Sequence, residues 1–132
     1  MNNLMNPKYP EGRNLFQGKN ILITAAAGSG IGFSTAKRFL EEGANIFISD
    51  IHQGRLEEAI DNLGNLNLGK VNGCLCNVTN DEEIDSMFTE AIACYSNLNG
   101  VINNAGLGGE SALEDMTNDA WDLVMDLSLI HI

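Results

Sequence analysis

The most restrictive feature of the sequence is a short apolar run that leads directly into a glycine-rich turn. Residues 20–24 (Asn-Ile-Leu-Ile-Thr) are uncharged and rich in β-branched side chains, which predicts a strand buried on both faces. Glycines follow at residues 28, 30 and 32, and residues 33–42 then carry apolar side chains at helical spacing up to Gly43, a helix C-cap. A strand, a glycine turn and a helix in this order indicate a sheet whose strands alternate with helices.

Segments of the same two kinds alternate along the rest of the chain. Thr79, with Glu82 three residues on, forms a capping box, and Thr117 is typical of a helix N-cap. The alternation predicts an α/β fold, a Rossmann-like doubly wound parallel sheet with three layers, α/β/α. The further strands are expected at residues 45–50, 71–78 and 100–103, and the further helices at residues 55–63, 79–95 and from 117 onward.

The charge excludes two classes of partner. The chain has 7 Lys and Arg against 18 Asp and Glu, a formal net charge of −11, whereas nucleic acids and anionic membrane surfaces are bound by basic proteins. The charge is also uneven, since eleven acidic residues and no Lys or Arg follow Lys70. No apolar run approaches the roughly 18–20 residues that span a bilayer. Residues 1–17 lack the apolar core of a signal peptide and are expected to be a flexible leader.

The cysteines point to a reducing compartment. Cys74, Cys76 and Cys94 are odd in number, which fits the cytoplasm better than a disulfide framework. Cys74 and Cys76 lie two apart in a predicted strand and therefore share a face. A Cys-x-Cys metal site is an alternative, but no further Cys or His cluster joins it, so we expect ordinary strand cysteines and no metal.

The glycine turn has the form of an anion site. Gly30 and Gly32 let the backbone approach a phosphate, and the free N–H groups at a helix start face it. Asp50 closes the second predicted strand eighteen positions after Gly32, where a carboxylate can accept hydrogen bonds from an adenosine ribose. A Walker-type loop is excluded because no Gly-Lys-Ser/Thr follows. Structural glycines with a solvated Asp50 are the plainer alternative.

Two segments together resemble one enzyme family. Residues 25–32 (Ala-Ala-Ala-Gly-Ser-Gly-Ile-Gly) and residues 103–106 (Asn-Asn-Ala-Gly) are similar to the hallmark motifs of short-chain dehydrogenases/reductases. The resemblance runs from about Lys19 to Asp126. It implies a sheet of strand order 3-2-1-4, about four strands of which are present, with NAD(H) or NADP(H) bound in the crevice between strands one and four.

The resemblance also implies a set of cofactor-binding residues. Asp50 would hold the adenosine ribose and favours NAD over NADP, because no Lys or Arg stands in the turn or directly after it to receive a 2′-phosphate. Ser29 could still touch a phosphate. The implied set is the pyrophosphate turn of Gly28, Ser29, Gly30, Ile31 and Gly32, the ribose carboxylate Asp50, the adenine neighbours Asn77 and Val78, and the strand-four residues Asn104, Ala105 and Gly106.

Two positions depart from the family pattern. The spacing from Thr24 to Gly30 is one residue longer than in the family, and alanines replace the first glycine of the turn. Asn77 stands where the family has Asp after strand three. Its amide oxygen can still accept from the adenine amino group, without a charge.

The catalytic residues of the family are absent from the sequence. The family reduces carbonyls with Tyr-x-x-x-Lys, but Tyr9 is followed four residues on by Arg13 and Tyr95 by Asn99, and Ser128 stands near the position of the family Asn. We therefore expect a truncated chain that binds the dinucleotide and is inactive alone. Its parts would be a leader at 1–17, the first part of an NAD(P)-binding domain at 18–126, and a non-native tail at 127–132 that resembles translated sequencing adapter.

Three functions follow from these observations. The first is an NAD(P)-dependent oxidoreductase that moves hydride between nicotinamide and a secondary alcohol or ketone, such as a 3-oxoacyl or steroid-like small molecule. The full-length parent would be a homodimer or homotetramer. The second is a non-catalytic dinucleotide-binding or regulatory module. The third, an S-adenosylmethionine-dependent methyltransferase, shares the glycine turn and the acidic end of strand two but does not account for residues 103–106.

Overall fold

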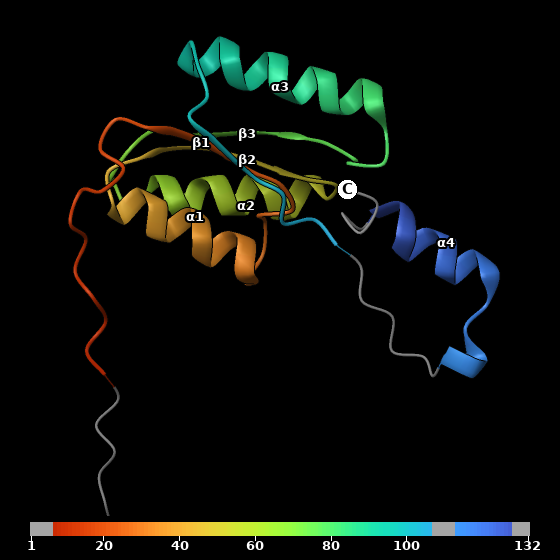
Figure 1. Cartoon of the computed structure of the whole chain (residues 1–132). Coiled ribbons are helices and arrows are strands. Elements are labelled where there is room, and N and C mark those ends of the chain that lie inside the picture. The colour runs from red at the N-terminus through yellow and green to blue at the C-terminus, as the bar shows by residue number, and fades with distance from the viewer. Residues whose placement is uncertain (1–6, 107–112, 128–132) are drawn as a thin grey trace, which may run out of the picture.

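Strands and helices alternate in the order that the sequence predicts (Figure 1). The computed structural model describes residues 7–106 and 113–127. Its elements are β1 (Asn20–Ile23), α1 (Ile31–Glu41), β2 (Asn45–Asp50), α2 (Gln53–Gly64), β3 (Val71–Leu75), α3 (Asp81–Tyr95), β4 (Gly100–Ile102), the short 3-10 helix η1 (Leu113–Asp115) and α4 (Asn118–Leu127).

The four strands form one parallel sheet in the order β3-β2-β1-β4, which confirms the predicted topology. In β1, Leu22 stands opposite Phe47 of β2 on one side and Val101 of β4 on the other. The chain therefore builds outward from β1 to β3 and then crosses back to β4. Ligands of such sheets bind where the strand order reverses, at the carboxyl ends of the strands. Here that point lies between β1 and β4.

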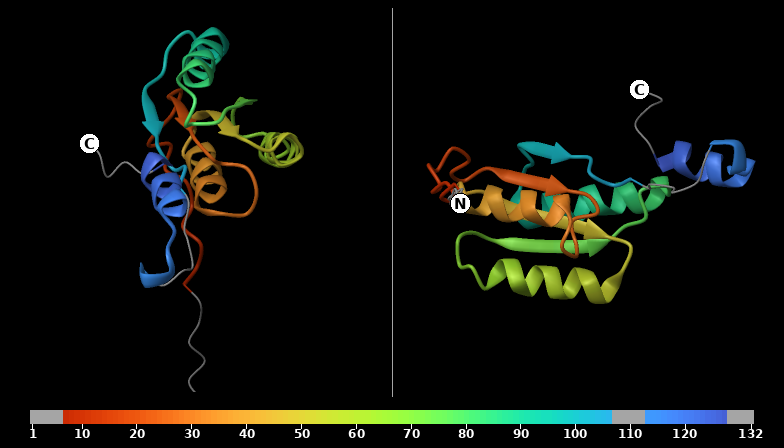
Figure 2. Two further views of the ribbon diagram at one scale, coloured as in Figure 1. Left: turned by 90° about the vertical axis from the view of Figure 1, so that its right-hand side faces the viewer. Right: turned by 90° about the horizontal axis from the view of Figure 1, so that it is seen from below.

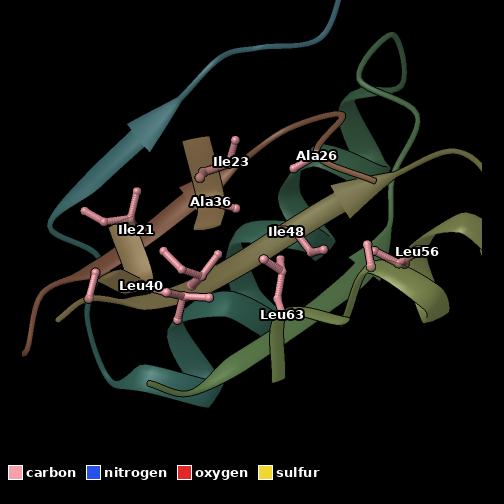
Figure 3. Packing of buried hydrophobic residues seen from close by; sticks show 11 residues of the cluster. Ile21, Ile23, Ala26, Ala36, Leu40, Ile48, Leu56 and Leu63 are labelled. Carbon is pink, nitrogen blue, oxygen red and sulfur yellow. The ribbon is translucent and has the colours of Figure 1, made fainter. Parts of the chain in front are cut away.

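Helices cover both faces of the sheet, with α1 and α2 on one face and α3 on the other (Figures 1 and 2). Ile21 and Ile23 of β1 enter the core under α1 and α2 (Figure 3), while Leu22 between them enters the core under α3. Successive strand residues point to opposite faces, so a strand covered on both sides is apolar throughout. Burying a side chain such as Leu22 or Ile23 contributes about 1.5–3 kcal/mol to folding.

Several elements begin or end at other residues than the sequence predicts; α2, for example, begins at Gln53 rather than residue 55. α1 begins at Ile31 rather than residue 33, so Ile31 and Gly32 belong to its first turn. β3 ends at Leu75 and not at residue 78. The N-cap of α3 is Asn80 instead of Thr79, because the Asn80 side chain accepts from the N–H groups of Glu82 and Glu83. Asn and Thr are both favourable N-cap residues, so the sequence alone does not decide between Thr79 and Asn80.

Residues 7–17 contain neither helix nor strand, but they contact α1. The Tyr9 hydroxyl donates to the Glu41 carboxylate at 2.6 Å. The N–H groups of Arg13 and Leu15 donate to the Glu42 carboxylate at 2.7 and 3.2 Å, and Arg38 pairs with the same carboxylate. The prediction of a flexible leader did not anticipate these contacts, which join residues far apart in the sequence.

Asparagine side chains connect the amino ends of the strands. The buried Asn20 amide donates to the backbone and side-chain oxygens of Asn97, in the turn before β4, at 3.0 and 2.9 Å. Its oxygen accepts from the side chain of Asn45 in β2 at 2.9 Å, and Asn45 in turn accepts from the N–H of Lys70 before β3 at 3.1 Å. These bonds fix the strands relative to one another at the edge opposite the crevice.

Helix α4 lies beyond the carboxyl ends of the strands (Figures 1 and 2). The Thr117 hydroxyl accepts from the N–H of Ala120 at 3.2 Å, as expected of the predicted N-cap. Trp121 and Leu123 are 48% and 55% exposed, so α4 presents apolar surface to the solvent. Within residues 7–106 and 113–127, no helix is long and apolar enough to cross a membrane.

Candidate functional site

The turn between β1 and α1 is shaped by two residues with left-handed backbone. Ala25 has φ +49° and Gly28 has φ +93°. A left-handed backbone is uncommon for a residue with a side chain, so Ala25 adopts a conformation that favours glycine. The N–H of Ala26 donates to the carbonyl of Ser49 in β2 at 3.0 Å, which holds the start of the turn against the sheet.

The segment after β4 holds the same turn from the other side. The Thr24 hydroxyl oxygen accepts from the N–H groups of Asn104 and Ala105 at 3.0 and 3.1 Å. The side-chain nitrogen of Asn104 donates to the carbonyls of Thr24 and Ala25 at 3.1 and 3.0 Å. Thr24 and Asn104 therefore join the two sequence motifs into one structure.

The glycines of the turn have different surroundings. A Cβ on Gly32 would lie 2.5 Å from the Asn104 side-chain nitrogen and 2.8 Å from the Ala25 carbonyl oxygen, so only glycine fits there. A Cβ on Gly30 would have nothing within 4 Å. Gly30 caps α1 without a side-chain hydrogen bond, and the first N–H groups of the helix stand beside this open space. The turn thus combines a packed glycine with an open one, and the open one lies where an anion is favoured by the helix dipole.

Asp50 closes β2 and is almost buried, at 7% exposure. Its Oδ1 accepts from the N–H of His52 at 3.0 Å and lies 3.6 Å from Nη2 of Arg55. Within the part of the chain that the structure describes, no group donates a hydrogen bond to Oδ2. The carboxylate therefore keeps acceptor capacity for a ligand, and its position beside the glycine turn suits a pair of ribose hydroxyls.

A cavity of about 350 Å³ lies at the carboxyl ends of the strands. It brings together five of the predicted residues, one from β2, two after β3 and two after β4. The sequence analysis did not predict Arg55 as a site residue, although it stands only five positions after Asp50. The lining residues are Ala25, Ala27, Asp50, Ile51, His52, Arg55, Cys76, Asn77, Val78, Ala105, Gly106 and Leu127.

The other predicted residues of the turn, apart from the packed Gly32, line neighbouring surfaces. Gly28 and Ser29 border a cavity of about 470 Å³ that Phe33 and Arg55 also line. Ser29, Gly30 and Ile31 lie at one end of a larger apolar groove of about 760 Å³ along α1. The polar groups that could select a ligand gather in the smaller cavity beside Asp50, so we place the candidate site there. Ser128 lies outside the described residues.

Asn77 forms hydrogen bonds with nearby residues of the segment between β3 and the first turn of α3. Its side-chain oxygen accepts from the N–H and the hydroxyl of Thr79 at 3.1 and 2.9 Å, and its N–H donates to Glu83 at 2.7 Å. Both lone pairs of this oxygen are in use, although the sequence analysis had offered it to an adenine amino group. The Asn77 side-chain nitrogen has no such bond among the described residues, so it is the atom of Asn77 left to face a ligand.

Cys74 lies in β3 and Cys76 directly after it, whereas Cys94 is an exposed residue of α3. Cys76 is buried against α3, and burial raises the pKa of its thiol. Burial, with a smaller contribution from Glu90, raises the pKa of the half-buried Cys74 to about 12. Both thiols therefore stay protonated at neutral pH, which suits packing better than metal binding. Among the described residues no group of three or more His, Cys, Asp or Glu side chains could hold a metal ion.

Comparison with known proteins identifies close relatives of this arrangement. The sequence profile described as short chain dehydrogenase matches residues 19–131. The (5R,7aS)-5-hydroxy-7a-methyl-1-oxo-2,3,5,6,7,7a-hexahydro-1H-indene-carboxyl-CoA reductase of Mycobacterium tuberculosis is 44% identical over 132 residues, all of this chain and 50% of the relative. The 3-oxoacyl-(acyl-carrier-protein) reductase FabG of Thermotoga maritima is 34% identical over 113 residues, 86% of this chain and 45% of that protein.

Solved structures agree with the sequence relatives. A short chain dehydrogenase from Mycobacterium smegmatis superposes with a TM-score of 0.88 at 45% identity, over 92% of this chain and 50% of the other. A short-chain dehydrogenase/reductase from Burkholderia xenovorans gives a TM-score of 0.77 at 27% identity, over 85% of this chain and 46% of the other. The chain spans about half the length of the relatives it matches.

Proposed function

Because this chain belongs to the short-chain dehydrogenase family, we propose that it binds NAD and forms the dinucleotide-binding half of an oxidoreductase. The observation that carries the proposal is the position of Asp50. Its nearly buried carboxylate borders a cavity that Ala105 and Gly106 also line, next to the turn at Gly30. An acidic acceptor for the ribose and an open helix start for the pyrophosphate are the two features that dinucleotide binding requires.

We assign one part of the dinucleotide to each region of the site. The pyrophosphate would lie at Gly30, where the backbone is uncovered and the α1 dipole favours negative charge. The adenosine ribose would bond to Oδ2 of Asp50. The adenine would lie near Asn77 and Val78, and the nicotinamide side would pass Ala105 and Gly106. The nicotinamide itself supplies the hydride chemistry.

The charge of Asp50 supports NAD over NADP. A ribose diol donates two hydrogen bonds to a carboxylate, whereas a 2′-phosphate brings a second negative charge to the same place. At about 4 Å, two like charges near a protein surface repel by roughly 4 kcal/mol. NAD is therefore the cofactor that we expect to bind more tightly.

The proposed reaction is hydride transfer between nicotinamide and a secondary alcohol or ketone. The relatives named above are reductases of a fused-ring carboxyl-CoA and of a 3-oxoacyl carrier-protein thioester, so a carbonyl on an acyl thioester is the substrate class that we propose. We expect these 132 residues alone to bind the cofactor without turning over. Tyr95, for example, does not have the surroundings of a proton donor, because its buried hydroxyl already donates to the carbonyl of Ile46 at 2.7 Å.

We also propose that α4 contributes to a subunit interface in the complete protein. Trp121 and Leu123 leave about half of their surface exposed on this helix. Aromatic and aliphatic side chains of this kind are enriched in the buried centre of protein interfaces. Light scattering of the complete protein, with and without Trp121→Ser, would detect a loss of the dimer or tetramer.

Calorimetric titration of NADH into purified residues 1–132 tests the proposed function. We expect saturable binding by the natural sequence, at least tenfold weaker binding by Asp50→Ala, and unchanged binding by Asp61→Ala, an exposed acidic residue of α2. S-adenosylmethionine serves as the second ligand. Binding of S-adenosylmethionine without binding of NADH would contradict the proposal and favour a methyltransferase, and steady-state dehydrogenase turnover would contradict the expected inactivity.

A further inference from the structure

Arg55 places a positive charge next to the carboxylate that is proposed to hold the ribose. It belongs to the first turn of α2, and its Nη2 lies 3.6 Å from Oδ1 of Asp50. This separation is too long for a hydrogen bond, and the side chain of Arg55 is 54% exposed whereas that of Asp50 is 8% exposed. The guanidinium therefore forms an ion pair with Asp50 without a hydrogen bond, and its N–H donors remain available to a ligand.

Arg55 also reaches the glycine turn. It lines the cavity beside Asp50 and the neighbouring cavity bordered by Gly28 and Ser29. Of the described residues that line these two cavities, Arg55 is the only Lys or Arg. Arg55 thus pairs with the carboxylate of Asp50 and lines one cavity together with Ser29.

A 2′-phosphate on the adenosine ribose would enter this same region. The 2′-oxygen is one of the two that Asp50 would bind, so a phosphate on it must project away from the carboxylate toward solvent. A guanidinium presents several N–H donors in a planar fork and binds phosphate oxygens in pairs. Arg55 can supply those donors, and the Ser29 hydroxyl can add one more.

On the basis of the proposed function, we propose that Arg55 is a second determinant of cofactor choice and binds the 2′-phosphate of NADP. Asp50 favours NAD and Arg55 offsets its charge, so the chain takes both dinucleotides. The sequence alone favoured NAD because no cation directly follows Asp50. In the structure, the first turn of α2 places a cation, Arg55, beside Asp50 although it lies five positions further along the chain.

Two other roles for Arg55 give different results in a binding experiment. If the guanidinium contacts the pyrophosphate, it helps NADH and NADPH equally, because both cofactors share that group. If it only neutralises Asp50, its removal leaves NADPH binding unchanged once Asp50 is also neutral. A comparison of the two dinucleotides in single and double variants therefore separates the three roles.

The experiment is calorimetric titration of NADH and NADPH into residues 1–132 and three variants, Arg55→Gln, Asp50→Asn and the double variant. We expect Arg55→Gln to weaken NADPH binding at least tenfold and NADH binding less than threefold. Asp50→Asn should strengthen NADPH binding, and the double variant should lose that gain. Lys70→Gln is the matched charge control, since Lys70 is exposed at the opposite edge of the sheet and should change neither affinity.

Each outcome decides between the proposals. Equal weakening of both dinucleotides by Arg55→Gln, or no weakening of either, would overturn the role of Arg55 and leave the proposed function intact. Failure of the natural sequence to bind either dinucleotide would overturn the proposed function and this inference with it. Circular dichroism of each variant checks that the exposed substitution at Arg55 has left the fold unchanged.

Discussion

The side-chain nitrogen of Asn104 lies 3.0 Å from the carbonyl oxygen of Ala25, so the segment after β4 holds the left-handed start of the turn after β1. Replacing Asn104 by Ala leaves the carbonyls of Thr24 and Ala25 without this donor. We expect the free energy of unfolding to fall by about 1–3 kcal/mol, measured by urea denaturation. The neighbouring Asn103 is exposed, and Asn103→Ala should change stability by less than about 0.5 kcal/mol. Equal effects of the two substitutions would contradict this role.

The two glycines that flank Ile31 should respond differently to a methyl group. Gly32→Ala places its Cβ 2.5 Å from the Asn104 side chain, and we expect a loss of about 1–3 kcal/mol in unfolding free energy. Gly30→Ala meets open space at φ −83° and should leave stability nearly unchanged. Its methyl group would instead stand where the pyrophosphate is proposed to lie, so NADH affinity should drop. A stable, NADH-binding Gly32→Ala protein would show that the close approach is relieved by small movements.

How far the sequence could predict these features depends on how local their causes are. The buried β1 and the acidic end of β2 at Asp50 follow from patterns within a few residues, and the predicted order of the sheet is confirmed. The left-handed backbone of Ala25 depends on Asn104, which lies 79 positions away. The approach of Arg55 to Asp50 depends on the direction in which α2 leaves the sheet. Contacts of this kind have no signature in a single stretch of sequence.

Ser49 carries a polar atom that the fold does not use. Its hydroxyl is fully buried, and no hydrogen-bond partner for it exists in the described part of the chain. Burying a hydroxyl without a partner costs free energy, so Ser49→Ala should raise the unfolding free energy by about 1 kcal/mol. Thr24→Val is the contrasting variant, because the Thr24 hydroxyl accepts two N–H groups and its loss should be destabilising. Destabilisation by both variants would indicate an internal water molecule bound to Ser49.

The Glu42 carboxylate should make the free energy of unfolding depend on pH. The N–H of Arg13, then that of Leu15 and the guanidinium of Arg38, hold the pKa of Glu42 below its usual 4.5, against the opposing effect of burial. The unfolded chain therefore takes up this proton first as the pH falls. Stability from this group is complete above about pH 4.5 and is lost as the pH falls through the lowered pKa. Urea denaturation of Glu42→Gln between pH 3 and 6 should show a weaker pH dependence than the natural sequence.

The thiols should react in an order set by exposure and burial. Cys94 is exposed, whereas Cys74 has its pKa raised to about 12 and Cys76 is buried. Only the thiolate is nucleophilic, so iodoacetamide at pH 8 should modify Cys94 well before the other two. Mass spectrometry of proteolytic peptides measures this order. Rapid modification of Cys74 in the folded protein would show that β3 separates from α3 more often than its burial suggests.

The Asn20 side chain has a consequence for protein engineering. It contacts Asn45 of β2 and Asn97 before β4, so one amide clamps three segments at the amino ends of the strands. The loops at the carboxyl ends do not take part in this clamp. The loops after β2 and β3 can therefore be exchanged between homologous enzymes to alter ligand preference. The asparagine contacts at the amino ends of the strands should keep the strand register unchanged. Grafts that leave Asn20, Asn45 and Asn97 in place are the ones expected to keep the parental architecture.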